Sequence, residues 1–316
     1  MGADLEVKGP APLPTWLLFL VPSFIWGTTW LTIKFQLGIV APEVSVVYRF
    51  GLASLVLFAW CRVRGISLRF DARTHASLVL LGLLQYALNY VLVYLSEGHL
   101  TSGLVAVIFV LIVAWNLIGA RIFFRRSLPP SILLGAVIGI AGVTLVFWPE
   151  VSHVRGSTDQ LWGVGLATLA TITASAGNLW SERVYAREVG VAPSTAWAMF
   201  YASIAVAIYC VLRGLPFTFD ASLPYVLSLT YLVLFGSVVA FVGFLTLLRR
   251  IGAGRAGYTA AVIPVLAMAT STVFEGYRWS ALALSGMMLV LLGNVFVLRG
   301  KQRALSAAAA RPVPTA

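Results

Sequence analysis

Long runs of apolar residues recur along almost the whole chain, and short stretches with charged residues, Pro or Gly separate them. Each run is close to the roughly 20 residues that a helix needs to cross the hydrocarbon layer of a membrane. The pattern predicts ten spans, at residues 15–34, 42–61, 76–96, 102–123, 129–148, 161–182, 193–213, 224–247, 256–275 and 279–298. The alternating strands of about ten residues that form a transmembrane β-barrel do not appear. The sequence therefore predicts an all-α polytopic membrane protein.

The composition excludes a water-soluble fold. Of the 316 residues, 60% are hydrophobic and 10% are charged, and the mean hydropathy is +0.93. A soluble domain is about half apolar and a quarter charged. The net charge of +11 could indicate nucleic-acid binding in a soluble protein, but in a membrane protein it indicates orientation. No nucleic-acid partner is expected.

The distribution of Lys and Arg predicts the orientation, because these residues stay on the cytoplasmic side of a membrane. If the N-terminus is inside, 17 of the 22 fall in cytoplasmic segments, while Lys34, Arg155, Arg213 and Arg278 fall outside and Arg49 lies within a span. Both termini are therefore predicted to be cytoplasmic. The first run has no cleavage site of small residues behind it, so it is expected to be a retained helix. Cys61 and Cys210 fall on opposite sides, and no disulfide is expected between them.

Two short matches indicate an internal repeat. Residues 106–111 resemble residues 261–266 at an offset of 155, and Gly135 and Gly142 correspond to Gly286 and Gly293 at an offset of 151. Five spans per unit would place the second unit upside down, and inverted repeats suit alternating access around a site near the midplane. The expected segments are a cytoplasmic tail at 1–14, a first unit at 15–148, an external linker at 149–160, a second unit at 161–298 and a cytoplasmic tail at 299–316.

Arg49 is the one charged residue that lies clearly inside a span, about seven residues into the second run, or roughly 10 Å along a helix. A charge in the hydrocarbon layer is costly and often functional. Arg49 could bind a carboxylate or phosphate of a substrate. Alternatively, it could pair with a nearby carboxylate or extend its long side chain to the outer surface.

The third span has one polar and aromatic face. At 100° per residue, Gln85, Tyr86, Asn89, Tyr90 and Tyr94 fall within one half of the helix, and apolar residues occupy the other half. The pattern favours a cavity wall that stacks and hydrogen-bonds a small organic solute. Alternatively, the face could serve hydrogen bonding between helices, with Tyr94 as an anchor at the membrane interface.

Several isolated residues inside other spans are further candidates. Trp26, Trp30, Asn116 and Asn178 are included as substrate-binding candidates, although a single aromatic inside a span more often serves packing or an interface belt than ligand contact. Pro264 interrupts the hydrogen bonding of the ninth span and is a candidate hinge. Gly135 and Gly139 form a small-residue pair that is expected to serve helix packing within the fold.

The carboxylates and histidines do not indicate an enzyme or a proton relay. Glu43, Glu97, Glu182 and Glu275 all fall near helix ends, and no Asp lies inside a span, which favours facilitated movement over tight proton antiport. His75, His99 and His153 lack the spacing of metal ligands. No nucleophile elbow, phosphate loop or selectivity-filter motif is present. We therefore expect no catalytic activity, no catalytic residues, no metal site and no cofactor.

Three segments carry a resemblance to a known family. Trp26-Gly-Thr-Thr-Trp-Leu-Thr-Ile-Lys34, Arg49-Phe-Gly-Leu-Ala-Ser-Leu55 and the stretch 248–264 ending at Pro264 resemble the ten-helix EamA-type exporters of the drug/metabolite transporter superfamily. The resemblance covers roughly residues 15–300. Many members have Glu just before that proline, whereas this chain has Ile263. The resemblance implies a cavity formed by spans one to four and six to nine, with five and ten behind.

The resemblance also implies export of small metabolites such as amino acids across a bacterial inner membrane. We therefore predict a secondary transporter for aromatic or other neutral amino acids, with Arg49 binding the carboxylate, Tyr86 and Tyr90 stacking, and Gln85 and Asn89 recognising amide or hydroxyl groups. Efflux of cationic or lipophilic drugs and a non-transporting membrane scaffold remain alternatives. The expected partners are a small-molecule substrate and the lipid bilayer, and the sequence leaves monomer or homodimer open.

Overall fold

The computed structural model describes residues 14–125, 130–152, 158–185, 189–244, 247 and 259–309, and this part of the chain is helical throughout its long elements. The helices up to the middle of the chain are α1 (Thr15–Lys34), α2 (Pro42–Val63), α3 (Ala72–Gly82), η1 (Leu83–Leu88), α4 (Asn89–Glu97), α5 (Ser102–Ile108), η2 (Phe109–Leu111), α6 (Ile112–Phe124) and α7 (Pro130–Ser152). The others are α8 (Thr158–Tyr185), α9 (Val191–Leu212), α10 (Leu223–Tyr231), η3 (Leu232–Val239), α12 (Thr259–Phe274) and α13 (Ala281–Ala309).

These elements join into ten helical spans within the described residues. The elements α3, η1 and α4 form one span from Ala72 to Glu97, while α5, η2 and α6 form another from Ser102 to Phe124. The prediction of an all-α protein with ten spans is confirmed, with boundaries shifted by a few residues. One boundary differs more, because α13 continues to Ala309, so that the start of the predicted tail 299–316 is helical. The predicted outer residues His153 and Arg155 lie outside the described residues.

The surface of the bundle is apolar, as expected for helices in contact with lipid. Among the described residues, six helices have the length and hydropathy to cross a membrane, and shorter apolar helices cover Pro130–Val146, Val262–Phe274 and Ala281–Val297. Helix α8 is long but less apolar, and its small residues Ala167, Ala170 and Ala174 are buried. Small side chains let a helix approach its neighbours closely, so this face of α8 packs against the third span and α6, while Leu169 and Ile172 elsewhere on the helix are exposed.

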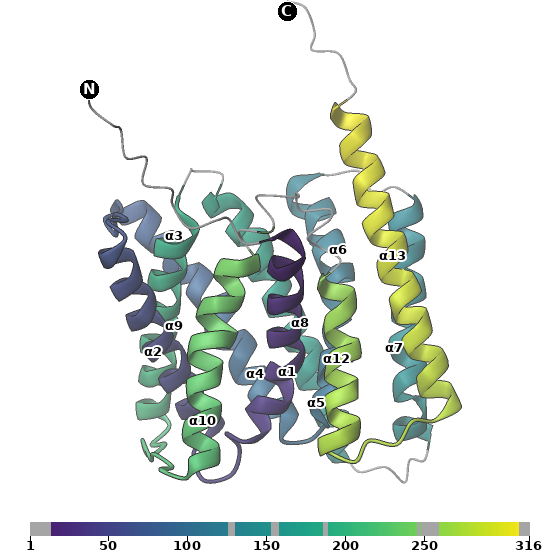
Figure 1. Ribbon diagram of the computed structural model, residues 1–316, viewed down its shortest axis with the longest axis horizontal. Coiled ribbons are helices and arrows are strands. Elements are labelled where there is room, and N and C mark those ends of the chain that lie inside the picture. The colour runs from purple at the N-terminus through teal and green to yellow at the C-terminus, as the bar shows by residue number, and fades with distance from the viewer. Residues whose placement is uncertain are drawn as a thin grey trace, which may run out of the picture.

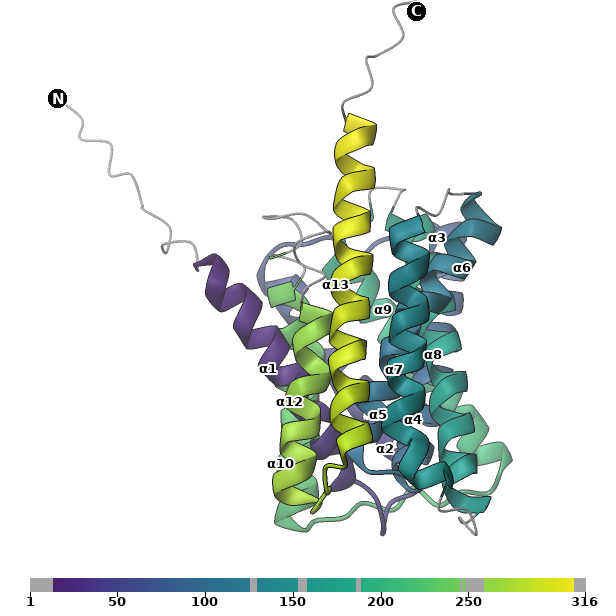
Figure 2. The same cartoon turned by 90° about the vertical axis from the view of Figure 1, so that its right-hand side faces the viewer.

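The fifth and tenth spans, α7 and α13, pack side by side at one edge of the bundle (Figures 1 and 2). A Cβ on Gly135 would lie 2.6 Å from the carbonyl oxygen of Gly293, and one on Gly142 would lie 2.6 Å from that of Gly286. The two helices therefore run antiparallel with their backbones in contact. Gly139 lies in the same interface, because a Cβ on Gly293 would be 2.6 Å from its backbone nitrogen, but a Cβ on Gly139 itself would meet nothing within 4 Å. The close packing therefore requires glycine at positions 135 and 142 but not at position 139 of the predicted pair.

The start of α1 and the end of α13 lie at the same end of the bundle (Figure 1). This arrangement fits an even number of spans with both termini on one side. The largest core cluster lies among α2, the third span, α9 and the eighth span, and includes Phe50, Tyr94, Met199 and Leu232. Cys61 and Cys210 are both free and buried in the bundle.

Two spans contain a π-helical segment. The segment η1 interrupts the third span and η3 interrupts the eighth, so each span changes register in its interior. A π-helical turn is wider than an α-helical turn because its backbone hydrogen bonds join residues five apart, and such turns often occur at functional sites. The uniform 100° per residue assumed for the third span is therefore wrong across Leu83–Leu88.

Candidate substrate site around Arg49

Arg49 is buried in the core, with 1% of its surface exposed. Its Nε donates to Ser237 Oγ at 3.4 Å and its Nη1 donates to the hydroxyl of Tyr94 at 3.5 Å. Among the described residues, the ion pairs are Lys34 with Glu275 and His99 with Asp159, and neither includes Arg49. The guanidinium neither pairs with a carboxylate in this part of the chain nor reaches the surface, so both packing explanations considered for it are wrong.

Aromatic rings surround the guanidinium of Arg49. The carbon atom Cζ lies 4.7 Å from the ring centroid of Tyr90 and 5.3 Å from that of Phe50. Tyr90 and Tyr86 both pack against Phe50, with centroid distances of 4.8 Å and 5.3 Å. The structure therefore brings Arg49, Tyr86 and Tyr90 together. Cation–π attraction stabilises the guanidinium by about 2 kcal/mol when the pair is away from water, but it does not place a carboxylate of the described residues within ion-pair distance of the positive charge.

A chain of hydrogen bonds holds the partners of Arg49. The Tyr94 hydroxyl donates to Gln36 Oε1 at 3.0 Å, and Gln36 Nε2 donates to Ser228 Oγ at 3.4 Å. Tyr94 is fully buried, so its interpretation as an interface anchor is wrong. Gln36 and Ser237 could not be predicted from the sequence, because a neutral side chain near a helix end is common and the register of η3 is not visible in the periodicity.

The segment η3 brings Trp26 close to the same place. Trp26 Nε1 donates to the carbonyl oxygen of Gly236 at 3.2 Å, and its ring packs at 5.3 Å against Phe241. The side chain of Ser237 donates to Leu232 O at 2.8 Å. These bonds use carbonyl groups in the π-helical segment, so Trp26 joins α1 to η3 beside Arg49.

Three predicted residues and Trp115, which was not predicted, present polar atoms without partners. Trp30 Nε1, Gln85 Oε1, Asn89 Oδ1 and Trp115 Nε1 are buried and make no hydrogen bond with the described residues. Asn89 Nδ2 donates to the Gln85 carbonyl at 3.2 Å, and Gly177 of α8 lies directly against Gln85. Buried polar groups normally have partners, so four unpaired atoms on inner helices are a candidate for contact with a solute or water.

The remaining predicted residues lie on other parts of the bundle. Asn116 Oδ1 accepts a hydrogen bond from Ser175 Oγ at 2.9 Å, which ties α6 to α8. Asn178 lies half-buried on α8, and Pro264 lies buried inside α12. The structure does not bring these three residues to Arg49, and the roles of Asn178 and Pro264 stay predictions.

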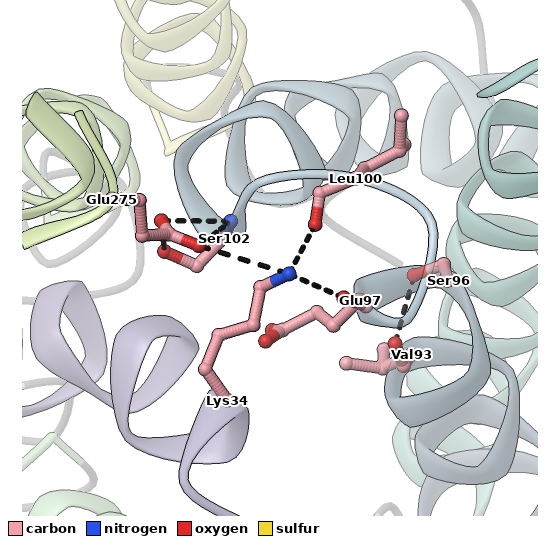
Figure 3. A network of polar contacts seen from close by, with 7 residues as sticks. All are labelled: Lys34, Val93, Ser96, Glu97, Leu100, Ser102 and Glu275. Carbon is pink, nitrogen blue, oxygen red and sulfur yellow. Dashed lines mark hydrogen bonds and ion pairs between the residues drawn. The ribbon is translucent and has the colours of Figure 1, made fainter. Parts of the chain in front are cut away.

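The sequence also gave no sign of a polar cluster at the end of the bundle opposite the termini. Lys34, Glu97, Ser102 and Glu275 meet there from four different elements (Figure 3). Glu97 and Glu275 were predicted only to lie near helix ends, and Glu97 is fully buried. Proximity across four spans is a property of the bundle and cannot be read from one chain.

The long apolar helices define a polytopic α-helical membrane protein. The model of the EamA-like transporter family matches residues 13–148 and again residues 161–299, so the chain belongs to this family, within the drug/metabolite transporter superfamily. The predicted resemblance is confirmed.

Curated relatives cover almost the whole chain. The uncharacterized inner membrane transporter YedA of Escherichia coli K12 is 26% identical over 290 residues, which are 92% of each chain. An uncharacterized transporter of Archaeoglobus fulgidus is 22% identical over 284 residues, covering 90% of this chain and 98% of that one. A solved crystal structure aligns with a TM-score of 0.68 at 17% identity over 92% of this chain and 98% of that chain, which supports the fold.

Proposed function

We propose that the protein exports small neutral amino acids, aromatic ones among them, across a bacterial inner membrane with both termini in the cytoplasm. The observation that carries this proposal is the guanidinium of Arg49, buried at 1% exposure with only neutral hydrogen-bond partners in the described chain. A buried charge without a counter-ion is costly, and a substrate carboxylate would supply the counter-ion through charge-assisted hydrogen bonds.

The groups around Arg49 support an amino acid over a simple anion. The rings of Tyr86, Tyr90 and Phe50 form an aromatic surface next to the guanidinium. On the same span, the unpaired oxygens of Gln85 and Asn89 can accept hydrogen bonds from a substrate ammonium group. A zwitterion with an aromatic side chain would match all three kinds of group.

Alternating access through an inverted repeat is supported by three observations. The family model matches the two predicted units separately. The π-helical segments η1 and η3 occupy corresponding spans of the two units. The glycine contacts are reciprocal. Gly135 contacts Gly293, and their equivalents in the other unit, Gly286 and Gly142, contact each other in the same way. Reciprocal contacts between antiparallel helices are typical of a two-fold relation, and an axis in the membrane plane would invert one unit.

The test is flux in liposomes that contain the purified protein. We expect saturable flux of tyrosine or phenylalanine and none of tyramine or phenethylamine, which lack the carboxylate. Arg49→Met should raise the half-saturation concentration about 10- to 100-fold, because a hydrogen bond to a charged group contributes about 1.5–3 kcal/mol. Arg213→Met is the matched control, since Arg213 also lies near a tyrosine ring, 6.0 Å from that of Tyr209, but is exposed.

The same experiment separates the rival functions. An uncompensated positive charge repels a cation, so the charge of Arg49 argues against efflux of cationic drugs. Flux of a lipophilic cation that is unchanged in Arg49→Met would overturn the proposal in favour of drug efflux. A protein that folds in the liposome but moves no solute of either kind would point to a membrane scaffold.

A further inference from the structure

Lys34, the last residue of α1, is held at the end of the bundle that is predicted to be external. Its Nζ donates to the main-chain carbonyls of Glu97 and Leu100, the latter at 2.6 Å, and lies 3.7 Å from Glu275 Oε1 (Figure 3). The ammonium therefore joins α1 to the loop after α4 and to the end of α12. Glu275 is its carboxylate partner.

Glu275 is fully engaged in this arrangement. Its two carboxylate oxygens accept from the backbone N–H of Ser102 at 3.1 Å and 3.0 Å, and one also accepts from the Ser102 hydroxyl at 2.5 Å. These contacts place a negative charge at the N-terminus of α5, where the helix dipole favours it. The cluster thus connects α12, in the second predicted unit, to α1 and α5, in the first.

Glu97 differs from Glu275, because its carboxyl group has no hydrogen-bond partner in the described part of the chain. Its side chain is fully buried, and neither carboxyl oxygen makes a hydrogen bond with any described residue. An ionised carboxylate in this position would cost several kcal/mol. The ammonium of Lys34 binds only the main-chain oxygen of Glu97, so the charge of Lys34 is balanced by Glu275 and not by Glu97. This geometry fits a Glu97 that carries a proton.

The charged groups that face Glu97 come from three elements. Lys34 lies at the end of α1, Glu275 after α12 and Arg49 on α2, and all three act on it electrostatically. Helix α5 has no titratable residue, and on α8 the nearby Asp159 pairs with His99 at 2.6 Å. On its own helix, the Tyr94 hydroxyl is occupied by Gln36 and Arg49.

We propose that the carboxyl group of Glu97 is a proton-binding site that controls closure of the outer end of the bundle. With the proton bound, Lys34 pairs with Glu275 and holds α1, α5 and α12 together, as in this structure. When the proton leaves to the external water, the Glu97 carboxylate takes the ammonium of Lys34, the link to Glu275 breaks and the outer end opens. The inference rests on alternating access in the proposed function. It requires no proton relay at the midplane.

The test measures opening of the outer end without any substrate. Ser271 lies fully buried on α12 against Gly103 of α5, and its hydroxyl has no hydrogen-bond partner among the described residues. Ser271→Cys is therefore a conservative probe of the contact between α5 and α12. In a chain with Cys61 and Cys210 replaced by Ala, the rate of labelling by a membrane-impermeant maleimide is followed as the external pH rises. The same probe in Glu97→Gln is the matched control, because the thiol chemistry is identical in both.

With Glu97 present, the labelling rate should rise several-fold between acidic and alkaline pH. In Glu97→Gln the outer end should stay closed, and the labelling rate should lack this several-fold rise. Lys34→Met should label rapidly at every pH, because the link to Glu275 is gone. Equal pH profiles with Glu97 and with Gln would overturn the proposal. Infrared spectroscopy gives an independent test: the spectrum of the unaltered protein minus that of Glu97→Gln should contain a protonated carboxylic acid band that disappears as the pH rises, and the absence of such a band at every pH would contradict the inference.

These readouts separate the two proposals. The labelling rates and the infrared bands are measured without any transported solute, so they test the proton site independently of the substrate. Loss of amino-acid flux in Arg49→Met with normal pH-dependent labelling would support both proposals. A pH-dependent outer end in a protein that moves no amino acid would support the proton site and contradict the proposed substrate.

Discussion

The contact between α7 and α13 gives a sharp prediction for a single methyl group. In Gly142→Ala, the new Cβ would lie 2.6 Å from the carbonyl oxygen of Gly286 and 2.6 Å from the backbone nitrogen of Val290. Both neighbours are backbone atoms, so no side-chain rotation can relieve the overlap and the helices must separate. Overpacking costs about 1–3 kcal/mol, and this case belongs at the upper end of that range.

Alanine also favours a helix over glycine by about 1 kcal/mol, so the net loss of stability in Gly142→Ala should be about 2 kcal/mol. The matched control lies one turn away on the same helix. A Cβ on Gly139 would meet nothing within 4 Å, so Gly139→Ala should change stability by no more than the helix-propensity gain of about 1 kcal/mol.

Thermal unfolding can be followed with a thiol-reactive dye, because Cys61 and Cys210 are free and fully buried until the bundle unfolds. Circular dichroism checks that the helices melt in the same transition. We expect Gly142→Ala to melt clearly below the unaltered protein and Gly139→Ala to melt at or above it. Equal melting of the two variants would refute the view that backbone contact at Gly142 holds the two helices together.

Three further predictions follow from individual residues. Tyr90→Leu should impair transport but leave membrane insertion intact, because the ring lies 4.7 Å from Cζ of Arg49, and unchanged flux would remove Tyr90 from the site. Hydrogen bonds from Thr74 hold the pKa of Asp71 below its usual value, so Asp71→Ala should lower the melting temperature at neutral pH. The difference between the two proteins should shrink as the pH falls through the lowered pKa, because Asp71 then takes up its proton. A reporter that is active only in the cytoplasm should be active when fused to Ala316, and a silent one would overturn the orientation.

The apolar pattern predicted the spans closely because lipid imposes it locally on each helix. The range 15–34 agrees with α1 at both ends. The predicted face of the third span was only partly useful, since η1 changes its register, although Arg49, Tyr86 and Tyr90 do come together. Neither Ser237 nor Gln36 could be predicted, because their importance depends on contacts across the bundle.

The sequence by itself determined a polytopic helical protein, its ten spans, its family and the presence of a charge inside a span. Each of these follows from local composition, since a helix satisfies its own backbone in lipid and only its side chains need to be apolar. The tertiary structure decided which groups meet. It showed that Arg49 has only neutral partners in the described chain and that Glu97, although at a helix end, is closed off from water. Burial and pairing depend on neighbouring helices, and the order of residues along one helix does not record them.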